Sequence, residues 1–257
     1  MKILLLGSHG FLGQHLKKEL LTKHELIKNL NKSRYIIDLS KPKNIKKKLK
    51  LLRPDLIINS AVKVNFKLKS SKLLNTINYL SVKKIVQYCK KNNIRLIQVS
   101  GTGVHPLLKR YNKYSILKPK SFYLKTKLRA DQYITKNLKN YQIVRFGGIF
   151  GDGGPNHLYI NKLLNSKKKT LNFEGNLSEK KNYIHVIDAS KFIMKLINLK
   201  KNGIFYSGGK TINFKRMLQL IKNKRNKKFH ITNIKRKKDE IVETEKWFRP
   251  KQFSYYI

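Results

Sequence analysis

Short apolar runs alternate with amphipathic stretches through the first 150 residues. The run at 2–6 is uninterrupted and ends at a glycine, which is typical of a buried parallel strand, and 11–23 places leucines at helical spacing. The same reading predicts strands at 25–30, 35–37, 55–59, 94–99 and 142–146, and helices at 43–52, 71–92 and within 117–140. Strands alternating with helices indicate right-handed crossovers and a parallel sheet.

The pattern loosens after the glycine-rich turn 151–155. Helices are expected at 157–166, 186–199 and 213–223, strands at 203–207 and 229–234, and a loop with one short strand at 168–183. We therefore expect an α/β fold of the Rossmann type, a doubly wound parallel sheet with a small C-terminal substrate-binding lobe. The nucleotide-binding domain would span 1–151, with 183–205 returning to it, and the lobe would comprise 152–182 and 206–257.

A glycine-rich turn follows the first predicted strand and opens the first predicted helix. Gly7, Gly10 and Gly13 have the spacing GxxGxxG. In a dinucleotide-binding unit such glycines allow a tight turn, close approach of the pyrophosphate, and close packing of helix on strand. The helix N-terminus then favours the anionic phosphates. The turn predicts NAD or NADP bound along Gly7, His9, Gly10, Phe11, Leu12 and Gly13.

Two downstream segments extend the predicted cofactor site. Asp38 and Leu39 follow the third predicted strand, where Asp38 either meets the adenine or is an ordinary turn residue. Asn59, Ser60 and Ala61 follow the fourth strand, and small residues there leave room for the cofactor at the carboxyl edge of the sheet. The end of the second strand, 31–34, holds basic residues and no acid for a ribose 2′-hydroxyl, which slightly favours NADP over NAD.

Tyr123 and Lys127 are four residues apart, so on a helix they share one face. An ammonium beside a phenol favours the phenolate, and the pair therefore predicts a Tyr123 pKa below its ordinary value and a general acid–base role. The pattern alone is weak in a chain this rich in Tyr and Lys. Its place, one strand–helix unit after Val99-Ser100-Gly101-Thr102, strengthens it.

With these pieces the chain resembles the extended short-chain dehydrogenase/reductases, the NAD-dependent epimerase/dehydratase group that acts on nucleotide-activated sugars. The resemblance runs from residue 1 to about 205. Beyond the glycine turn and the Tyr/Lys pair, it rests on Asn78, Val99-Ser100, Arg145–Gly151 and Tyr183–Asp188. The stretch Arg53–Ala61 after Asp38–Pro42 is similar to the dTDP-4-dehydrorhamnose reductases within that group.

The resemblance implies that Tyr123 exchanges a proton with the substrate oxygen, while Lys127 lowers its pKa and binds the nicotinamide ribose. It also places Asn78 at the cofactor and Arg145 and Asn156 at a nucleotide-diphosphate sugar. For Arg145 a plain ion pair at a strand end is an equal alternative. His185 and Asp188 are expected to cap a helix and orient the returning chain.

The family's substrate-holding hydroxyl should fall at position 101, which is Gly101 here. Ser100 or Thr102 could supply it after a one-residue slip, with Thr102 preferred. The implied activity is 4-keto reduction first, epimerisation second and dehydration third. Dehydration is disfavoured because Thr102-Gly103 lacks the acidic residues that dehydratases of the family usually add. The alternative is a catalytically weakened NAD(P)-binding protein with a regulatory or assembly role.

Composition adds one open question. The formal charge is +46, which fits either a polyanion-binding surface or compositional drift, and the dominance of Lys over Arg favours drift and no specific nucleic-acid partner. The single cysteine, Cys89, fits a reducing compartment, and we expect a cytoplasmic protein without a membrane anchor. No histidine spacing suggests a metal site. A homodimer through the two long helices is expected from the resemblance.

Overall fold

The computed structural model describes residues 1–27, 36–235 and 239–257. Its centre is a six-stranded sheet in the order β10-β6-β4-β3-β1-β2, with all neighbouring strands parallel. The strands are β1 (Lys2–Leu6), β2 (Glu25–Leu26), β3 (Leu56–Asn59), β4 (Arg95–Gly101), β6 (Tyr141–Phe146) and β10 (Gly203–Ser207). The chain leaves β1 toward β2, crosses back and continues from β3 in the other direction. The predicted doubly wound α/β fold is confirmed.

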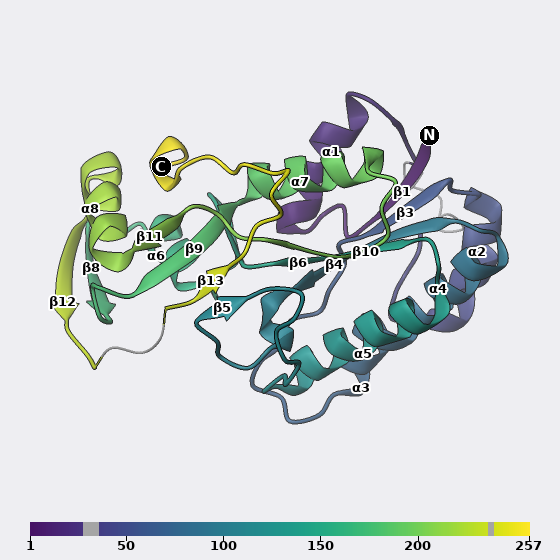
Figure 1. The fold of residues 1–257 in the computed structure, drawn as a ribbon, viewed down its shortest axis with the longest axis horizontal. Coiled ribbons are helices and arrows are strands. Elements are labelled where there is room, and N and C mark those ends of the chain that lie inside the picture. The colour runs from purple at the N-terminus through teal and green to yellow at the C-terminus, as the bar shows by residue number, and fades with distance from the viewer. Residues whose placement is uncertain (28–35, 236–238) are drawn as a thin grey trace.

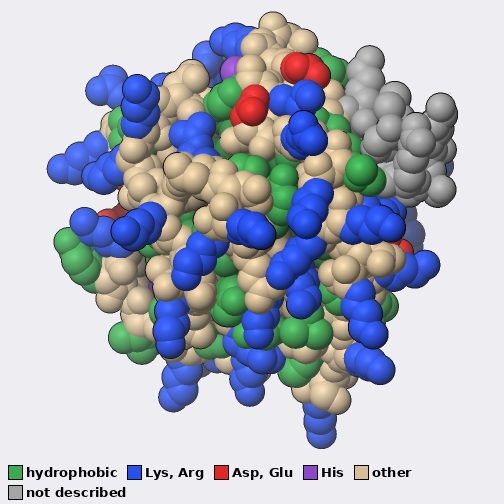
Figure 2. Space-filling model, turned by 90° about the vertical axis from the view of Figure 1, so that its right-hand side faces the viewer, with side chains coloured by type: hydrophobic (Ala, Val, Ile, Leu, Met, Phe, Trp, Pro, Cys, Tyr) green, Lys and Arg blue, Asp and Glu red, His purple; other side chains and the backbone are tan. Residues whose placement is uncertain are grey.

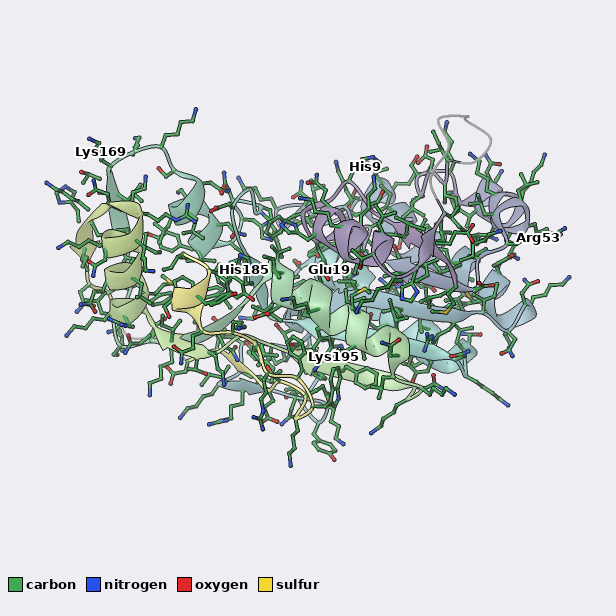
Figure 3. All side chains as sticks on the ribbon, turned by 90° about the horizontal axis from the view of Figure 1, so that it is seen from above. His9, Glu19, Arg53, Lys169, His185 and Lys195 are labelled. Carbon is green, nitrogen blue, oxygen red and sulfur yellow. The ribbon has the colours of Figure 1, made fainter. Side chains whose placement is uncertain are left out.

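Helices cover both faces of this sheet (Figure 1). α1 (Phe11–Leu21) and α7 (Val186–Asn198) lie side by side on one face, as Figure 3 also shows, and α2 (Ile45–Leu52), α4 (Ser81–Lys91) and α5 (Phe122–Asn137) cover the other. Successive residues of β1 face opposite cores, since Ile3 packs with α1 and α7 and Leu4 packs with α2 and α4. The uninterrupted apolar part of β1, Ile3–Leu6, is therefore explained by burial on both faces.

The carboxyl ends of the strands meet along one edge. Leu6 of β1 is in register with Asn59 of β3, which is in register with Gln98 of β4. Further along the sheet, Gly101 of β4 is in register with Phe146 of β6. The glycine turn, the segment 59–61 and the segment 100–102 consequently emerge at the same edge, where open α/β sheets bind their ligands.

Within the nucleotide-binding part, the helix expected at 71–92 and the strand expected at 35–37 differ from the structure. The long helix expected at 71–92 consists of α3 (Lys72–Asn75), a π-helical turn η3 (Thr76–Leu80) and α4. The strand expected at 35–37 is wrong for its described part, because residues 36 and 37 lie outside any strand, and the Ile36 carbonyl accepts a hydrogen bond from the Lys48 side chain. Residue 35, and positions 28–30 of the strand expected at 25–30, lie outside the described residues.

A lobe beyond β6 packs around its own apolar core, which includes Phe150, Phe173 and Met217. Its elements are β7 (Gly148–Phe150), α6 (Tyr159–Asn165), β8 (Thr170–Glu174), β9 (Lys180–His185), β11 (Thr211–Asn213), α8 (Phe214–Arg225) and β12 (Lys228–Thr232). Strand β9 pairs with β7 and β11, and β8 pairs with β12. The region 168–183, expected to be mostly loop, is thus more ordered than predicted, because β8 finds a distant partner 58 residues along the chain in Lys228–Thr232. The exact division between domain and lobe stays a prediction.

Short elements complete the connections: the 3-10 turns η2 (Pro42–Asn44), η4 (Thr102–Val104) and η5 (Phe253–Tyr255), and the parallel pair β5 (Arg110–Tyr111) and β13 (Ile241–Val242). Within the described part of the chain, no helix is long and apolar enough to cross a membrane. Lys and Arg side chains are spread over the face shown in Figure 2 and do not form one bounded patch there. The cytoplasmic location and the homodimer stay predictions.

Candidate active site

The glycine turn has the geometry that a dinucleotide needs. Gly7 has φ +81°, and a Cβ on it would lie 2.6 Å from the Ala61 backbone nitrogen. A Cβ on Gly13 would lie 1.9 Å from the Gly7 carbonyl oxygen, so this glycine is required for α1 to pack against the turn. Gly10 precedes α1, and no side chain caps the helix there. The first amide groups of α1 are thus available to an anion, and the residues present fit a bound pyrophosphate.

The other predicted residues of this turn differ in exposure. His9 is exposed, Phe11 is half-buried, and Leu12 is buried in the core between the sheet and α1. A contact between Leu12 and a cofactor would therefore be made by its backbone. These three cofactor contacts stay predictions.

The segment after β3 is fixed by hydrogen bonds. The Ser60 hydroxyl donates to the Leu6 carbonyl oxygen at 2.8 Å, and the Asn59 side chain accepts from the Ala61 amide at 3.2 Å. Asn78, in the π-helical turn, bonds both the amide and the carbonyl of Lys63 at 2.9 Å. Asn78 therefore holds the loop that follows Ala61, and π-helical turns are frequent at functional sites. A direct contact between Asn78 and the cofactor stays a prediction.

Asp38 forms a turn on its own backbone. Its carboxylate accepts from the Ser40 hydroxyl at 2.7 Å and from the Ser40 amide at 2.9 Å. These bonds hold the pKa of Asp38 below its usual value. Leu39 is buried against the core. The geometry favours the turn interpretation of Asp38, and the adenine contact stays a prediction.

Lys127 is buried and anchored to the sheet. Its ammonium donates to the Val99 carbonyl oxygen of β4 at 2.8 Å. Burial lowers the pKa of Lys127, and the nearby Asp131 carboxylate opposes that shift. The helix α5 that carries both Lys127 and Tyr123 begins at a Ser121 cap, whose side chain accepts from the Leu124 amide.

Tyr123 corrects one expectation. Burial raises the pKa of Tyr123 to about 12, where the Tyr/Lys spacing predicts a lowered value. The cause is desolvation of the phenol by burial. The Lys127 ammonium donates to the Val99 carbonyl, and no hydrogen bond between it and the Tyr123 phenol is found among the described residues. In this state Tyr123 is held as a phenol, the form that donates a proton.

The structure gives different surroundings to the three positions considered for the substrate-holding hydroxyl, 100, 101 and 102. The Ser100 hydroxyl is buried and donates to the Asp131 carboxylate at 2.9 Å. Gly101 has an extended backbone, and a Cβ there would lie 3.6 Å from the Phe146 carbonyl oxygen, an ordinary contact. Within the described ranges, the hydroxyls of Thr102 and Tyr123 have no hydrogen-bond partner. The geometry favours Thr102 over Ser100.

Arg145 lies deep inside the protein. Its guanidinium is paired with Asp131 at 3.2 Å and donates to the Tyr206 hydroxyl at 2.7 Å, and the residue is 3% exposed. This arrangement favours the ion-pair interpretation of Arg145 over a contact with a diphosphate. Asn156 is exposed in the lobe and accepts from the Asn165 amide group at 2.8 Å, so its substrate contact stays a prediction.

His185 and Asp188 have the structural roles expected of them. The His185 Nδ1 accepts from the Ile187 amide and caps α7, and burial lowers the pKa of His185 to about 4. The Asp188 carboxylate accepts from the Lys251 amide and the Tyr256 hydroxyl at 2.8 and 2.7 Å. These contacts fasten the C-terminal segment to the start of α7, which Figure 3 marks with His185.

Sequence reasoning missed an aromatic contact at Tyr123. The ring of Phe66, from the loop after β3, meets Tyr123 edge-on with centroids 5.0 Å apart. His157, from the lobe, lies 5.6 Å from the same Phe66 ring. Phe66 is 46% exposed despite its size, and a large aromatic in a polar loop was the only sequence signal for it.

Comparison with known proteins gives several relatives. The chain is 26% identical over 180 residues to a dTDP-4-dehydrorhamnose reductase of Salmonella typhimurium, an alignment covering 66% of this chain and 59% of that protein. A dTDP-4-dehydrorhamnose reductase of Clostridium acetobutylicum has a similar structure, with a TM-score of 0.81, 21% identity, and coverage of 95% of this chain and 90% of that one. The enzyme of that name from Bacillus anthracis, in complex with NADP, gives a TM-score of 0.78, 16% identity and coverage of 95% and 90%.

The two structural likenesses show the fold alone, and the chain spans less than two thirds of the curated relative. A family model reaches further along this chain. The model described as the RmlD substrate binding domain matches residues 1–210, which is most of the 257 residues. This match covers the glycine turn, the helix α5 with Tyr123 and Lys127, and all six strands of the central sheet. The chain therefore belongs to the RmlD substrate binding domain family.

Proposed function

We propose that this protein is an NAD(P)H-dependent reductase that converts the 4-keto group of a nucleotide-activated sugar to a hydroxyl. One observation carries the proposal. The glycine turn that fits a pyrophosphate and the free hydroxyls of Thr102 and Tyr123 belong to segments that leave the sheet at one edge. A site with a dinucleotide cradle beside a proton donor is suited to carbonyl reduction.

The relatives support the substrate and the cofactor. The curated relative is named a dTDP-4-dehydrorhamnose reductase, and a similar structure of that name holds NADP. We extend both assignments to this chain as part of the proposal, with NADPH favoured over NADH. The substrate would lie between the nucleotide-binding sheet and the lobe that carries Asn156 and His157.

In this reaction Tyr123, Thr102 and Lys127 each have a separate role. Bound NAD(P)H would supply the hydride that adds to the sugar carbon. Tyr123, protonated because burial raises its pKa to about 12, donates its proton to the developing alkoxide. Thr102 donates a hydrogen bond to the same oxygen, and Lys127 contributes positive charge beneath the site. Proton and hydride together convert the ketone to an alcohol and leave the oxidised cofactor and the Tyr123 phenolate, which regains a proton from water before the next turnover.

A second candidate is a catalytically weakened protein that binds NAD(P) in a regulatory or assembly role. Gly101 is the observation that favours it, because the family's hydroxyl is expected at this position. The free Thr102 hydroxyl one residue later favours the reductase instead.

Purified protein mixed with NADPH or NADH and a panel of 4-keto nucleotide-sugars tests the proposal. We expect loss of the 340 nm absorbance of NADPH, roughly one equivalent per equivalent of ketone consumed, with free cofactor and free sugar as controls. Cofactor binding without oxidation on any 4-keto sugar would overturn the reductase and favour the weakened protein. Interconversion of two sugars without net oxidation would indicate an epimerase.

A further inference from the structure

A buried chain of hydrogen bonds lies beside the candidate active site and has no part in the proposed chemistry so far. It begins at the Asp131 carboxylate of α5, which accepts from Arg145 of β6 at 3.2 Å. Arg145 donates to the Tyr206 hydroxyl of β10 at 2.7 Å. The Tyr206 hydroxyl is 3.0 Å from His105 Nε2, and His105 Nδ1 is 2.6 Å from the Ile116 carbonyl oxygen.

The partners fix the direction of every bond in this chain. A carbonyl oxygen only accepts, so His105 Nδ1 carries the proton that bonds Ile116, and in neutral His105 the Nε2 atom accepts. The Tyr206 hydroxyl then donates to His105 and accepts from Arg145, whose guanidinium can only donate. Burial lowers the pKa of His105, which keeps the ring in this neutral form. One arrangement therefore satisfies the Arg145–Tyr206–His105 part of this network, while at its far end Asp131 accepts through Oδ2 and leaves its buried Oδ1 without a partner.

The chain ends in the loop 105–118, which separates the two candidate catalytic hydroxyls. Thr102 lies just before the loop and Tyr123 just after it. The loop exposes large apolar side chains, with Ile116 63% and Tyr114 82% exposed. His105 joins the start of the loop to Ile116 near its end, and the Lys118 amide adds a bond to the Val104 carbonyl at 3.1 Å. The position of the loop thus affects both hydroxyls.

Tyr206 also joins this loop to the C-terminal segment. Its amide donates to the Glu245 carboxylate at 3.2 Å, and its carbonyl accepts from the Glu245 amide at 3.1 Å. Just before Glu245, β13 pairs with β5 inside the loop, and the two strands lie side by side in Figure 1. Tyr206 is therefore the point at which the sheet, the loop and the C-terminal segment meet.

We propose that Tyr206 is a positioning residue, which through His105 holds the loop 105–118 in the conformation that aligns Thr102 and Tyr123 on the substrate. The inference rests on the proposed function for its effect on turnover. It assigns Arg145 a role through Tyr206 in place of contact with the diphosphate. The attachment of the loop itself does not depend on which reaction the protein performs.

The test replaces Tyr206 by Phe and compares it with Tyr88→Phe. Tyr88 is also buried, and its hydroxyl makes a single bond to the Leu49 carbonyl at 3.0 Å, away from the loop. Hydrogen exchange is measured over 104–121 and, as reference, over β1 and α1. We expect Tyr206→Phe to raise exchange in 104–121 about tenfold, because Arg145 and His105 each lose a buried partner, and Tyr88→Phe to leave it unchanged.

A second variant removes the same hydrogen bond between Tyr206 and His105 from the His105 side. His105→Asn can keep the bond to Ile116 but no longer reaches Tyr206, and its exchange in 104–121 should rise as in Tyr206→Phe. The double variant should show no further increase, since both changes break one chain. Unchanged exchange in Tyr206→Phe, or an equal rise in Tyr88→Phe, would overturn the inference.

Steady-state kinetics with a 4-keto nucleotide-sugar then separates positioning from folding. Tyr206→Phe should lower kcat about tenfold while the Kd for NADPH stays at the wild-type value. An unchanged kcat together with raised exchange would contradict the proposed alignment of Thr102 and Tyr123. If the wild-type protein reduces no substrate, the proposed function fails, and the exchange result still decides whether Tyr206 holds the loop.

Discussion

The Ser100 hydroxyl donates a 2.9 Å hydrogen bond to the buried Asp131 carboxylate. Asp131 also accepts from Arg145 and lies one helical turn after Lys127, so Ser100 belongs to the polar cluster beneath α5. Thr102, two residues later, keeps a free hydroxyl at the carboxyl edge. The difference supports the proposal that Ser100 has a structural role and Thr102 a catalytic one.

The first prediction tests that assignment. Thr102→Val should lower kcat about 10²- to 10³-fold with little change in stability, because it removes a donor to the reacting oxygen. Ser100→Ala should leave kcat within about threefold of wild type and lower the free energy of unfolding by about 1 kcal/mol. Urea unfolding and steady-state kinetics on both variants decide the matter. The reverse pattern would place the catalytic hydroxyl on Ser100.

Gly101 offers a test by gain of function. The space around it accepts a Cβ, and its extended backbone suits any residue, so Gly101→Ser should fold with unchanged or slightly higher stability. If Thr102 already holds the substrate oxygen, kcat should change by less than about threefold. A rise of tenfold or more would show that the natural protein lacks the hydroxyl, which contradicts our assignment of Thr102.

The pH dependence follows from Tyr123. Reduction consumes the Tyr123 proton, and burial raises the pKa of Tyr123 to about 12, so the phenol persists as the pH rises and is lost only as the pH approaches that value. The kcat/KM for reduction, which reports the free enzyme, should therefore stay level from about pH 7 to about pH 9. Tyr123→Phe should lower turnover about 10²- to 10⁴-fold with cofactor affinity unchanged.

A fall in kcat/KM on the alkaline side with a midpoint near neutrality would indicate that the pKa of Tyr123 is lowered and not raised. It would mean that the Lys127 ammonium lowers the Tyr123 pKa, as the spacing of the two residues predicts from sequence.

Two glycines of the turn have different predicted roles, Gly13 in packing of the fold and Gly10 in cofactor binding. Gly13→Ala should destabilise the fold by about 2 kcal/mol or more, because its Cβ would lie 1.9 Å from the Gly7 carbonyl oxygen. Gly10→Ala meets that oxygen at 3.3 Å, so it should cost much less stability and weaken NADPH binding about tenfold by hindering approach of the pyrophosphate. Thermal unfolding and cofactor titration measure the two effects. Wild-type affinity in a folded Gly10→Ala protein would place the phosphates elsewhere.

Much of this architecture could be predicted from local patterns. The apolar run 2–6, the glycines at 7, 10 and 13, and the alternation of strands and helices fixed the sheet and its ligand-binding edge, because each depends on burial and backbone conformation near in sequence. Tyr123 and Lys127 share α5 as their spacing predicts. The strand predicted at 35–37 is wrong for residues 36 and 37, the described part of that range. A short apolar run gives no information about whether a partner strand is available.

The remaining features depend on contacts between distant segments. Burial of Tyr123 raises its pKa where the spacing predicts a lowered one, and this burial does not follow from helical spacing. The bond from Lys127 to Val99 likewise joins a helix to a distant strand. Arg145 pairs with Asp131 and Tyr206, 14 and 61 residues away, so its burial could not be predicted from its strand alone. Phe66 meets Tyr123 from the loop after β3, which Asn78 holds at Lys63.

The most direct measurement of the central claim follows the hydride itself. Purified protein is incubated with a 4-keto nucleotide-sugar and NADPH that carries deuterium at both hydrogen positions of nicotinamide C4, and the product is analysed by NMR and mass spectrometry. We predict one deuterium per product, located at sugar C4 with a single stereochemistry, and no labelled product with Tyr123→Phe on the same timescale. Product without deuterium at C4, or no product while NADPH remains bound, would contradict the proposed reductase.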